Sequence, residues 1–219
     1  MPHSNPPKTA SRNLPSQKRA FPCDLDSLYE AAVKALARRA QSTAEIVRSL
    51  EKKKADPKQI GEVLRRLKEN GYLDDARFAR SFACTRLENE QFGKERVRRD
   101  LKSRGVMEPV AQQAIGQAYQ DVDEGELLRR YLKRRVNVPE AFSKPSKLVG
   151  LFRRLLRAGF ASDTIVRELK QIVKSLESPQ VKGRSREWRD LVLPSLDDTL
   201  EFLAECHQAE EGAESESDE

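Results

Sequence analysis

The chain is poor in the side chains that most enzymes use for covalent, acid–base or metal chemistry. It has only two histidines and three cysteines among 219 residues. His3 and His207 lie near the two ends in segments of low apolar content, which argues against a nucleophile–His–carboxylate site in a folded core. Cys23, Cys84 and Cys206 are too far apart for a metal-ligand pattern or a disulfide framework. We therefore expect no enzyme activity, no cofactor and no metal.

Long apolar runs are also missing. No stretch approaches the roughly 20 apolar residues that a membrane-spanning helix needs, and the Pro- and Ser-rich start has no apolar segment typical of a secretory signal. Aromatic residues make up 6% of the chain and charged residues 35%, which favours thin helical layers over one thick core. We expect a reduced, cytoplasmic protein without membrane contact, and a monomer.

The charge is distributed unevenly. Residues 190–219 contain 11 of the 35 acidic residues and no Lys or Arg, so residues 1–189 carry 41 basic against 24 acidic residues, a net charge of +17. A body of this charge attracts polyanions, nucleic acid first among them. The composition predicts a disordered basic arm at 1–24, and a basic loop, a short acidic helix and a disordered acidic tail at 179–219.

A helical period begins at Leu28 and defines a first three-helix module. Ser42-x-x-Glu45 predicts a capping box that opens the second helix, and Asp56-Pro57 predicts the start of the third.

The segment after the third helix organises the chain. Gly71 closes that helix in a left-handed conformation, and Asp74 or Asp75 opens the next one. Between these signals Tyr72 and Leu73 are expected to enter the crevice where the helices meet. Phe78 then begins the apolar face of a fourth helix, which extends to Leu87.

The pattern recurs along the chain. An offset of 51 residues places Ile46 and Leu50 on Val97 and Leu101, and a further offset of 54 places Gly105 on Gly159. These repeats predict an all-α fold of three tandem three-helix repeats in an elongated, curved, solenoid-like array. The expected modules are 25–73, 74–121 and 122–178.

The sequence offers two other candidate sites, a phosphate-binding loop and a metal site. Glu95 follows Gly93-Lys94 where a phosphate-binding loop needs Ser or Thr, so no Walker A motif is present. Asp74 and Asp75 could hold Mg²⁺ for nuclease work, although helix capping explains them more simply.

Basic residues occur on the helices of all three modules. A charge run is usually a solvated helix face, but three successive modules of the same sign favour a polyanionic or acidic partner. The candidate binding residues are Arg38, Arg39, Lys52, Lys53, Arg65, Arg66, Lys94, Arg96, Arg98, Arg99, Lys102, Arg104, Arg129, Arg130, Lys133, Arg134, Arg153, Arg154 and Arg157.

Several segments together resemble the RecX regulatory proteins of bacteria. They are GYLDD at 71–75, ARFARSF at 76–82, FGKERVRRDLKSRGV at 92–106 and KLVGLFRRLLRAGF at 147–160. The similarity covers approximately residues 28–174 and implies three tandem three-helix repeats. In this family the joint Gly71, Tyr72, Leu73, Asp74, Asp75 and Phe78 is structural, and no catalytic residue is carried over.

The resemblance also implies a partner and an activity. Members of the family bind the RecA recombinase, lie in the groove of its filament on single- or double-stranded DNA without sequence preference, and inhibit ATP hydrolysis, strand exchange and co-protease activity. Two alternatives remain, a helix-turn-helix DNA-binding regulator and a scaffold for acidic proteins. The resemblance does not explain the acidic tail, for which we weigh autoinhibition of the basic modules against a solubilising end.

Overall fold

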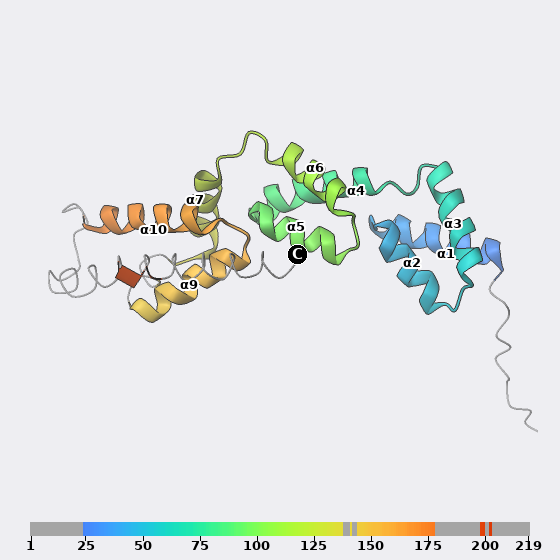
Figure 1. The fold of residues 1–219 in the computed structure, drawn as a ribbon, viewed down its shortest axis with the longest axis horizontal. Coiled ribbons are helices and arrows are strands. Elements are labelled where there is room, and N and C mark those ends of the chain that lie inside the picture. Colours follow the sequence, from blue (N-terminus) through green and yellow to red (C-terminus); the bar gives the residue numbers. More distant parts are fainter. Residues whose placement is uncertain (1–23, 138–140, 142–143, 178–197, 200–201, 203–219) are drawn as a thin grey trace, which may run out of the picture.

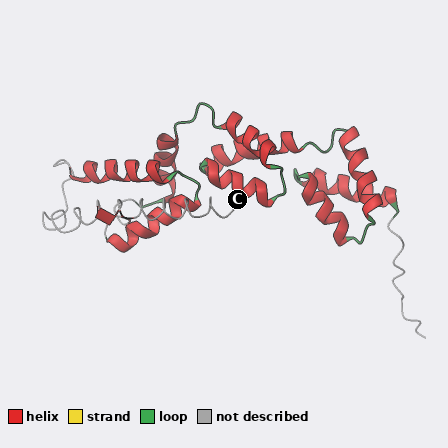
Figure 2. Ribbon diagram, viewed as in Figure 1, coloured by secondary structure: helices red, strands yellow, loops and turns green. Residues whose placement is uncertain are grey.

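The computed structural model describes residues 24–137, 141, 144–177, 198, 199 and 202. Every regular element within these residues is a helix, and the helices form an elongated, curved array (Figures 1 and 2). The predicted all-α fold of tandem three-helix repeats is confirmed. The expected arm at 1–24, apart from Asp24, and most of the region 179–219 lie outside the described residues. No helix in the described part of the chain is long and apolar enough to cross a bilayer.

The first triplet consists of α1 (Leu25–Arg38), α2 (Thr43–Lys52) and α3 (Pro57–Glu69). The predicted capping box opens α2. Ser42 Oγ accepts a hydrogen bond from the Glu45 backbone N–H at 3.1 Å, and the Glu45 carboxylate accepts one from the Ser42 N–H at 3.1 Å. This reciprocal pair satisfies backbone donors that the first turn of a helix leaves without partners.

The second triplet consists of α4 (Asp75–Thr85), α5 (Lys94–Ser103) and α6 (Glu108–Ala118). A π-helical turn, η1 (Arg86–Glu90), extends α4, where the sequence predicts a plain α-helix up to Leu87. π-Helical turns are rare and change the direction in which the following side chains point.

The third triplet consists of α7 (Glu124–Arg135), α9 (Pro145–Arg157) and α10 (Ser162–Glu177). Glu124, the first residue of α7, caps α10 as well, because its Oε1 accepts a bond from the Ala161 N–H at 3.0 Å. The starts of α7 and α10 are therefore linked by this bond as well as through their apolar faces.

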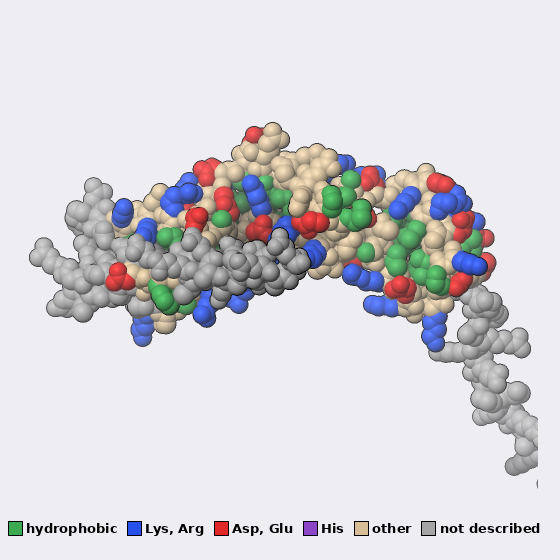
Figure 3. Space-filling model, viewed as in Figure 1, with side chains coloured by type: hydrophobic (Ala, Val, Ile, Leu, Met, Phe, Trp, Pro, Cys, Tyr) green, Lys and Arg blue, Asp and Glu red, His purple; other side chains and the backbone are tan. Residues whose placement is uncertain are grey.

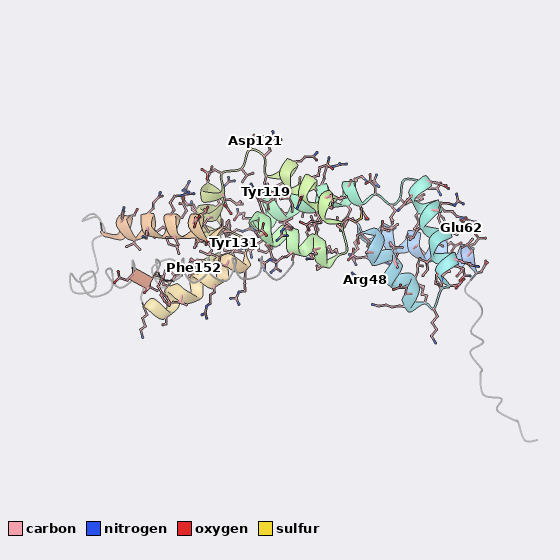
Figure 4. The ribbon with its side chains drawn as sticks, in the orientation of Figure 1. Arg48, Glu62, Tyr119, Asp121, Tyr131 and Phe152 are labelled. Carbon is pink, nitrogen blue, oxygen red and sulfur yellow. The ribbon has the colours of Figure 1, made fainter. Side chains whose placement is uncertain are left out.

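The buried apolar side chains form two clusters, not three. The first core joins α1, α2, α3 and Leu73, and its fully buried members include Leu28, Ile46 and Leu67. The second core runs without interruption from Phe78 on α4 to α10. Tyr131 of α7 and Phe152 of α9 lie within it (Figure 4). The second and third triplets thus share one interior, whereas the first has its own.

Candidate functional site

The segment between α3 and α4 is the predicted structural joint. Gly71 has a φ of +69°, which a glycine adopts without a Cβ penalty. Leu73 is buried in the first core, and Phe78 is buried in the second. Tyr72 is 51% exposed, so the prediction that it enters the crevice with Leu73 is wrong. The Leu73 side chain fills the available space between the helices, and the Tyr72 ring stays at the surface.

The two aspartates of the joint have different tasks. Asp74 caps α4, because its Oδ1 accepts bonds from the backbone N–H groups of Ala76 and Arg77 at 2.9 Å. These bonds, that from Arg77 foremost, lower the pKa of Asp74 below its ordinary value. Asp75 Oδ1 accepts a bond from the Thr43 N–H at 2.8 Å, at the start of α2. Among the described residues no group of three or more His, Cys, Asp or Glu side chains could hold a metal. The carboxylates of Asp74 and Asp75 already accept hydrogen bonds from backbone N–H groups.

The end of α5 meets the start of α2. We call this contact the first joint; it is distinct from the segment between α3 and α4 described above. Ser42 Oγ donates to the Arg104 carbonyl oxygen at 2.6 Å. Arg48 Nη1 donates to the Ser103 carbonyl oxygen at 3.3 Å, and Arg48 is labelled on α2 in Figure 4. The carbonyls at the C-terminus of α5 thus receive hydrogen bonds from the N-cap residue and from the middle of α2, and the C-terminus of one helix faces the N-terminus of the other.

The end of α9 meets the start of α5 in the same way, and this contact is the second joint. The Gly93 N–H donates to the Ala158 carbonyl oxygen at 2.9 Å. Arg99 Nη2 donates to the Arg157 carbonyl oxygen at 3.3 Å.

The two joints use equivalent positions. Arg99 follows Arg48 by 51 residues, and Arg157 follows Ser103 by 54, the same offsets that relate the apolar positions. The bond from an arginine to a carbonyl of the next triplet is therefore repeated. As a result α9, α5 and α2 follow one another along the lower, concave side of the array in Figure 1. We refer to these three helices as the axial line.

A glycine is required at each joint. A Cβ on Gly105 would lie 2.4 Å from the Ala44 Cβ, and a Cβ on Gly159 would lie 2.2 Å from the Arg96 backbone nitrogen. Both glycines also have positive φ, +78° and +91°. Lys54 is the equivalent residue of the first triplet and has a φ of +60°. A side chain is tolerated there because the axial line ends at α2.

Eight of the 19 candidate basic residues form ion pairs within the protein. Arg104 of α5, for example, contacts Glu45 across the first joint at 2.9 Å, and Arg98 contacts Glu95 at 2.9 Å. Each of these guanidinium groups therefore already has a carboxylate partner. The eight are Arg39, Arg65, Arg66, Arg96, Arg98, Arg104, Arg129 and Arg130.

Three further candidates donate to backbone carbonyls of another helix or turn. Arg99 bonds across the second joint, Arg134 donates to the Asn89 carbonyl oxygen at 2.7 Å, and Arg154 donates to the Arg135 carbonyl oxygen at 3.2 Å. Arg99 and Arg134 thereby link the second and third triplets, and Arg154 links two helices of the third.

The remaining eight candidates are exposed and have no side-chain partner within the described residues. Six of them belong to the axial line or the residue after it, and Lys and Arg side chains project along this lower edge in Figure 3, with others on the upper side. The eight are Arg38, Lys52, Lys53, Lys94, Lys102, Lys133, Arg153 and Arg157.

An arginine–aromatic cluster, which the sequence analysis did not predict, lies beside the two joints. The Arg86 and Arg104 guanidinium carbons lie 4.8 and 4.9 Å from the centre of the Phe82 ring. Arg135 lies 5.7 Å from the centre of the Phe92 ring. Such contacts are attractive because the face of an aromatic ring carries negative charge. They cover the half-buried rings at the edge of the second core.

The same cluster holds the π-helical turn in place. Arg135 forms an ion pair with Glu90, and Arg134 donates a hydrogen bond to the carbonyl oxygen of Asn89. Both arginines belong to the last turn of α7, 45 residues away in the sequence. Separations of this size explain why the sequence pattern gave no signal for these contacts.

One carboxylate is deeply buried. Glu168 of α10 is 3% exposed, and its Oε2 accepts a bond from Arg129 Nη1 at 2.6 Å. This bond raises the pKa of Arg129. Gly125 leaves room for the carboxylate, because a Cβ there would lie 2.5 Å from Glu168 Oε1. The pair links α7 to α10 and is structural.

Comparison with known proteins identifies a family. The family described as RecX, second three-helix domain, matches residues 74–115. The chain is 33% identical over 144 residues to the regulatory protein RecX of Leptothrix cholodnii, an alignment that covers 66% of this chain and 88% of that protein.

Two further relatives are more distant. The regulatory protein RecX of Oceanobacillus iheyensis is 24% identical over 169 residues, and the alignment spans 77% of this chain but 60% of that longer relative. The crystal structure of RecX from Lactobacillus salivarius has the same fold, with a TM-score of 0.57 at 20% identity, covering 68% of this chain and 96% of that one. With its repeated triplets and its match to the Leptothrix protein, the chain belongs to the RecX family of regulatory proteins.

Proposed function

We propose that this protein is a non-enzymatic inhibitor of the RecA recombinase. It binds the groove of the RecA filament on DNA and suppresses ATP hydrolysis, strand exchange and co-protease activity in the cytoplasm. Membership of the RecX family supports RecA as the partner. In this proposal the modules 25–73, 74–121 and 122–178 contact successive positions along the filament.

The observation that carries the proposal is the axial line. On each of its three helices it presents exposed cations that have no partner among the described residues, for example Lys52, Lys102 and Arg157. A row of such charges suits a polymer whose phosphates repeat along its length, and each phosphate neutralised releases a counterion. The cations that are already paired with carboxylates contribute less to this attraction, because their charge is compensated within the protein.

The elongated shape explains how binding becomes inhibition. Weak contacts at several points of one lattice add up, because the first contact raises the effective concentration of the others. A protein that bridges neighbouring RecA subunits in this way restrains the movements between subunits that hydrolysis and strand exchange require. No catalytic group of its own is needed for that effect.

The first test measures ATP hydrolysis by RecA on single-stranded DNA while this protein is added at sub-stoichiometric to equal amounts. We expect hydrolysis to fall as the filament becomes occupied. Unaltered hydrolysis would contradict the proposal, and tight binding to one duplex sequence instead would favour the helix-turn-helix alternative.

The second test removes unpaired charges from the axial line. Replacing Lys102 and Arg157 by Gln should lower the dependence of single-strand affinity on salt, with a decrease of about 1.4 in the slope of log K against log salt concentration. The matched control replaces Lys58 and Lys68 of α3, which are also exposed and unpaired among the described residues. Equal losses in both variants would show that only net charge matters and would contradict a role for the axial line.

A further inference from the structure

Tyr72 lines an open groove that the proposed contact with DNA does not use. The groove has a volume of about 420 Å³ and lies between the end of α1 and the start of α4. Val33 and Leu36 of α1 and Phe78 of α4 supply apolar walls, and Arg77 lines it with Tyr72. Met107 and Phe202 are the other large apolar side chains with high exposure in the described part of the chain, and neither lines this groove.

The charge around the groove is positive. Arg77 is held in place because its Nη2 donates to the Gly71 carbonyl oxygen at 2.9 Å. Asp74 also lines the groove, but its carboxylate already accepts two backbone N–H groups at the start of α4. Arg80, one turn beyond Arg77, lies close enough for its charge to act on Asp74, and it has no carboxylate within bonding distance among the described residues. An incoming anionic group therefore meets Arg77 on the groove wall and the charge of Arg80 nearby, which together exceed the single negative charge of Asp74.

We propose that this groove docks a protein segment that presents one large apolar side chain next to a carboxylate. The inference rests on the proposed function, in which that segment belongs to the filament protein. The apolar walls are suited to the side chain, and the arginines are suited to the carboxylate. Tyrosine and arginine are also the residues that most often dominate the binding energy of protein interfaces.

A nucleic acid fits the same features less well. Proteins that bind single strands stack successive bases on several aromatic rings along a basic track. Here Tyr72 is the one well-exposed ring of the groove, because Phe78 is buried, and Val33 and Leu36 offer nothing to a phosphate or a sugar. The apolar walls therefore favour a protein segment over a nucleic acid.

The position of the groove adds a consequence. Its walls come from α1 and α4, which belong to the two separate cores. A segment bound there contacts both cores at once and holds the first triplet in one orientation relative to the second. Docking and the alignment of the axial line are then coupled.

The main experiment compares Tyr72→Ala with the wild-type protein in binding to RecA filaments and to single-stranded DNA alone. We expect about tenfold weaker filament binding and unchanged DNA binding. Tyr72→Phe should retain filament binding, because the ring remains. Met107→Ala, which removes another exposed apolar side chain, is the matched control and should change neither. Thermal unfolding of each variant checks that the fold is intact.

Two outcomes would overturn the proposal. Equal weakening of filament and DNA binding by Tyr72→Ala would indicate a base-stacking site. Unchanged filament binding by Tyr72→Ala, together with a loss in the Lys102→Gln/Arg157→Gln variant, would show that the axial line binds without the groove.

A second measurement is independent of RecA and keeps the groove testable if the wild-type protein does not bind filaments. Nuclear magnetic resonance shifts of Leu36, Tyr72 and Phe78 are followed while N-acetyl-phenylalanine or N-acetyl-phenylalaninamide is added. We expect shifts at these residues, with about tenfold weaker binding of the amide, which lacks the carboxylate. Absence of shifts, or equal binding of both probes, would overturn the inference whatever the outcome for the proposed function.

Discussion

The first and second joints share one bonding pattern but differ in their surroundings. At the first joint the contacts are polar, and the apolar cores on its two sides stay separate. At the second joint the apolar core is continuous, and Tyr131 and Phe160 pack edge to face with 5.5 Å between ring centres. The bonding pattern fixes the direction in which triplets follow one another, whereas the apolar contact area determines how firmly they are held.

The magnitudes support this distinction. A hydrogen bond within a protein contributes about 0.5–1.5 kcal/mol, because water competes for both partners. Full burial of one large apolar side chain contributes about 1.5–3 kcal/mol, and the second joint is surrounded by several. We therefore expect the array to bend or open first between α2 and α5.

The largest effect is expected from Gly159→Ala at the second joint. The new methyl group would collide with the Arg96 backbone in a left-handed conformation. The unfolding free energy should fall by about 3 kcal/mol, from the cost of the left-handed Cβ and of overpacking. Urea denaturation measures this. Gly150→Ala within α9 meets nothing within 4 Å and should raise the unfolding free energy by about 0.5–1 kcal/mol.

Gly105→Ala should open the first joint, as Gly159→Ala disrupts the second. Its methyl group would meet Ala44, but no shared apolar core holds the two sides together there. We expect the first triplet to detach while both cores remain folded, so that hydrogen exchange accelerates only at the joint. Loss of protection throughout the second core would contradict the separation of the two cores.

A smaller effect of opposite sign is expected from Lys54→Gly. Lys54 has the left-handed conformation of the joint glycines without a neighbouring triplet that requires it. Glycine should therefore raise the unfolding free energy of the first core by about 1 kcal/mol. A destabilised Lys54→Gly variant would mean that the lysine side chain makes a contact of its own.

The smallest effect concerns acid. Hydrogen bonds from Arg65, then from Arg66, lower the pKa of Glu62 to about 2 from an ordinary value of 4.5. A lowered pKa means that the unfolded chain takes up the proton more readily, so the stabilisation is full above pH 4.5 and disappears as the pH falls towards 2. Water screens this exposed network, so its contribution is modest. An acid titration of the first core should be flatter in Glu62→Gln; identical titration curves would contradict the assignment.

Local signals in the sequence predicted most of the helix ends. The capping box of Ser42 and Glu45 depends on residues three apart, so the sequence contains all the information. The choice between Asp74 and Asp75 as the cap stayed open, because it depends on where α2 lies: Asp75 turns to the Thr43 N–H. The exposure of Tyr72 depends in the same way on packing that no local pattern describes.

The sequence could not separate paired from unpaired cations. Arg98 and Glu95 are three residues apart and could be recognised as neighbours on one helix. Arg104 and Glu45 are 59 residues apart and meet only because α5 and α2 abut. Gly105 and Gly159 likewise look like ordinary helix ends in the sequence, and only the neighbouring triplet shows why a Cβ is excluded.

The recurrence of one contact at both joints gives the chain a modular length. Because the end of each axial helix presents the same carbonyls to the next triplet, another unit of some fifty residues could be inserted without inventing a new interface. The length of the array can then be increased or decreased by whole triplets, without a change in the contacts of the other triplets.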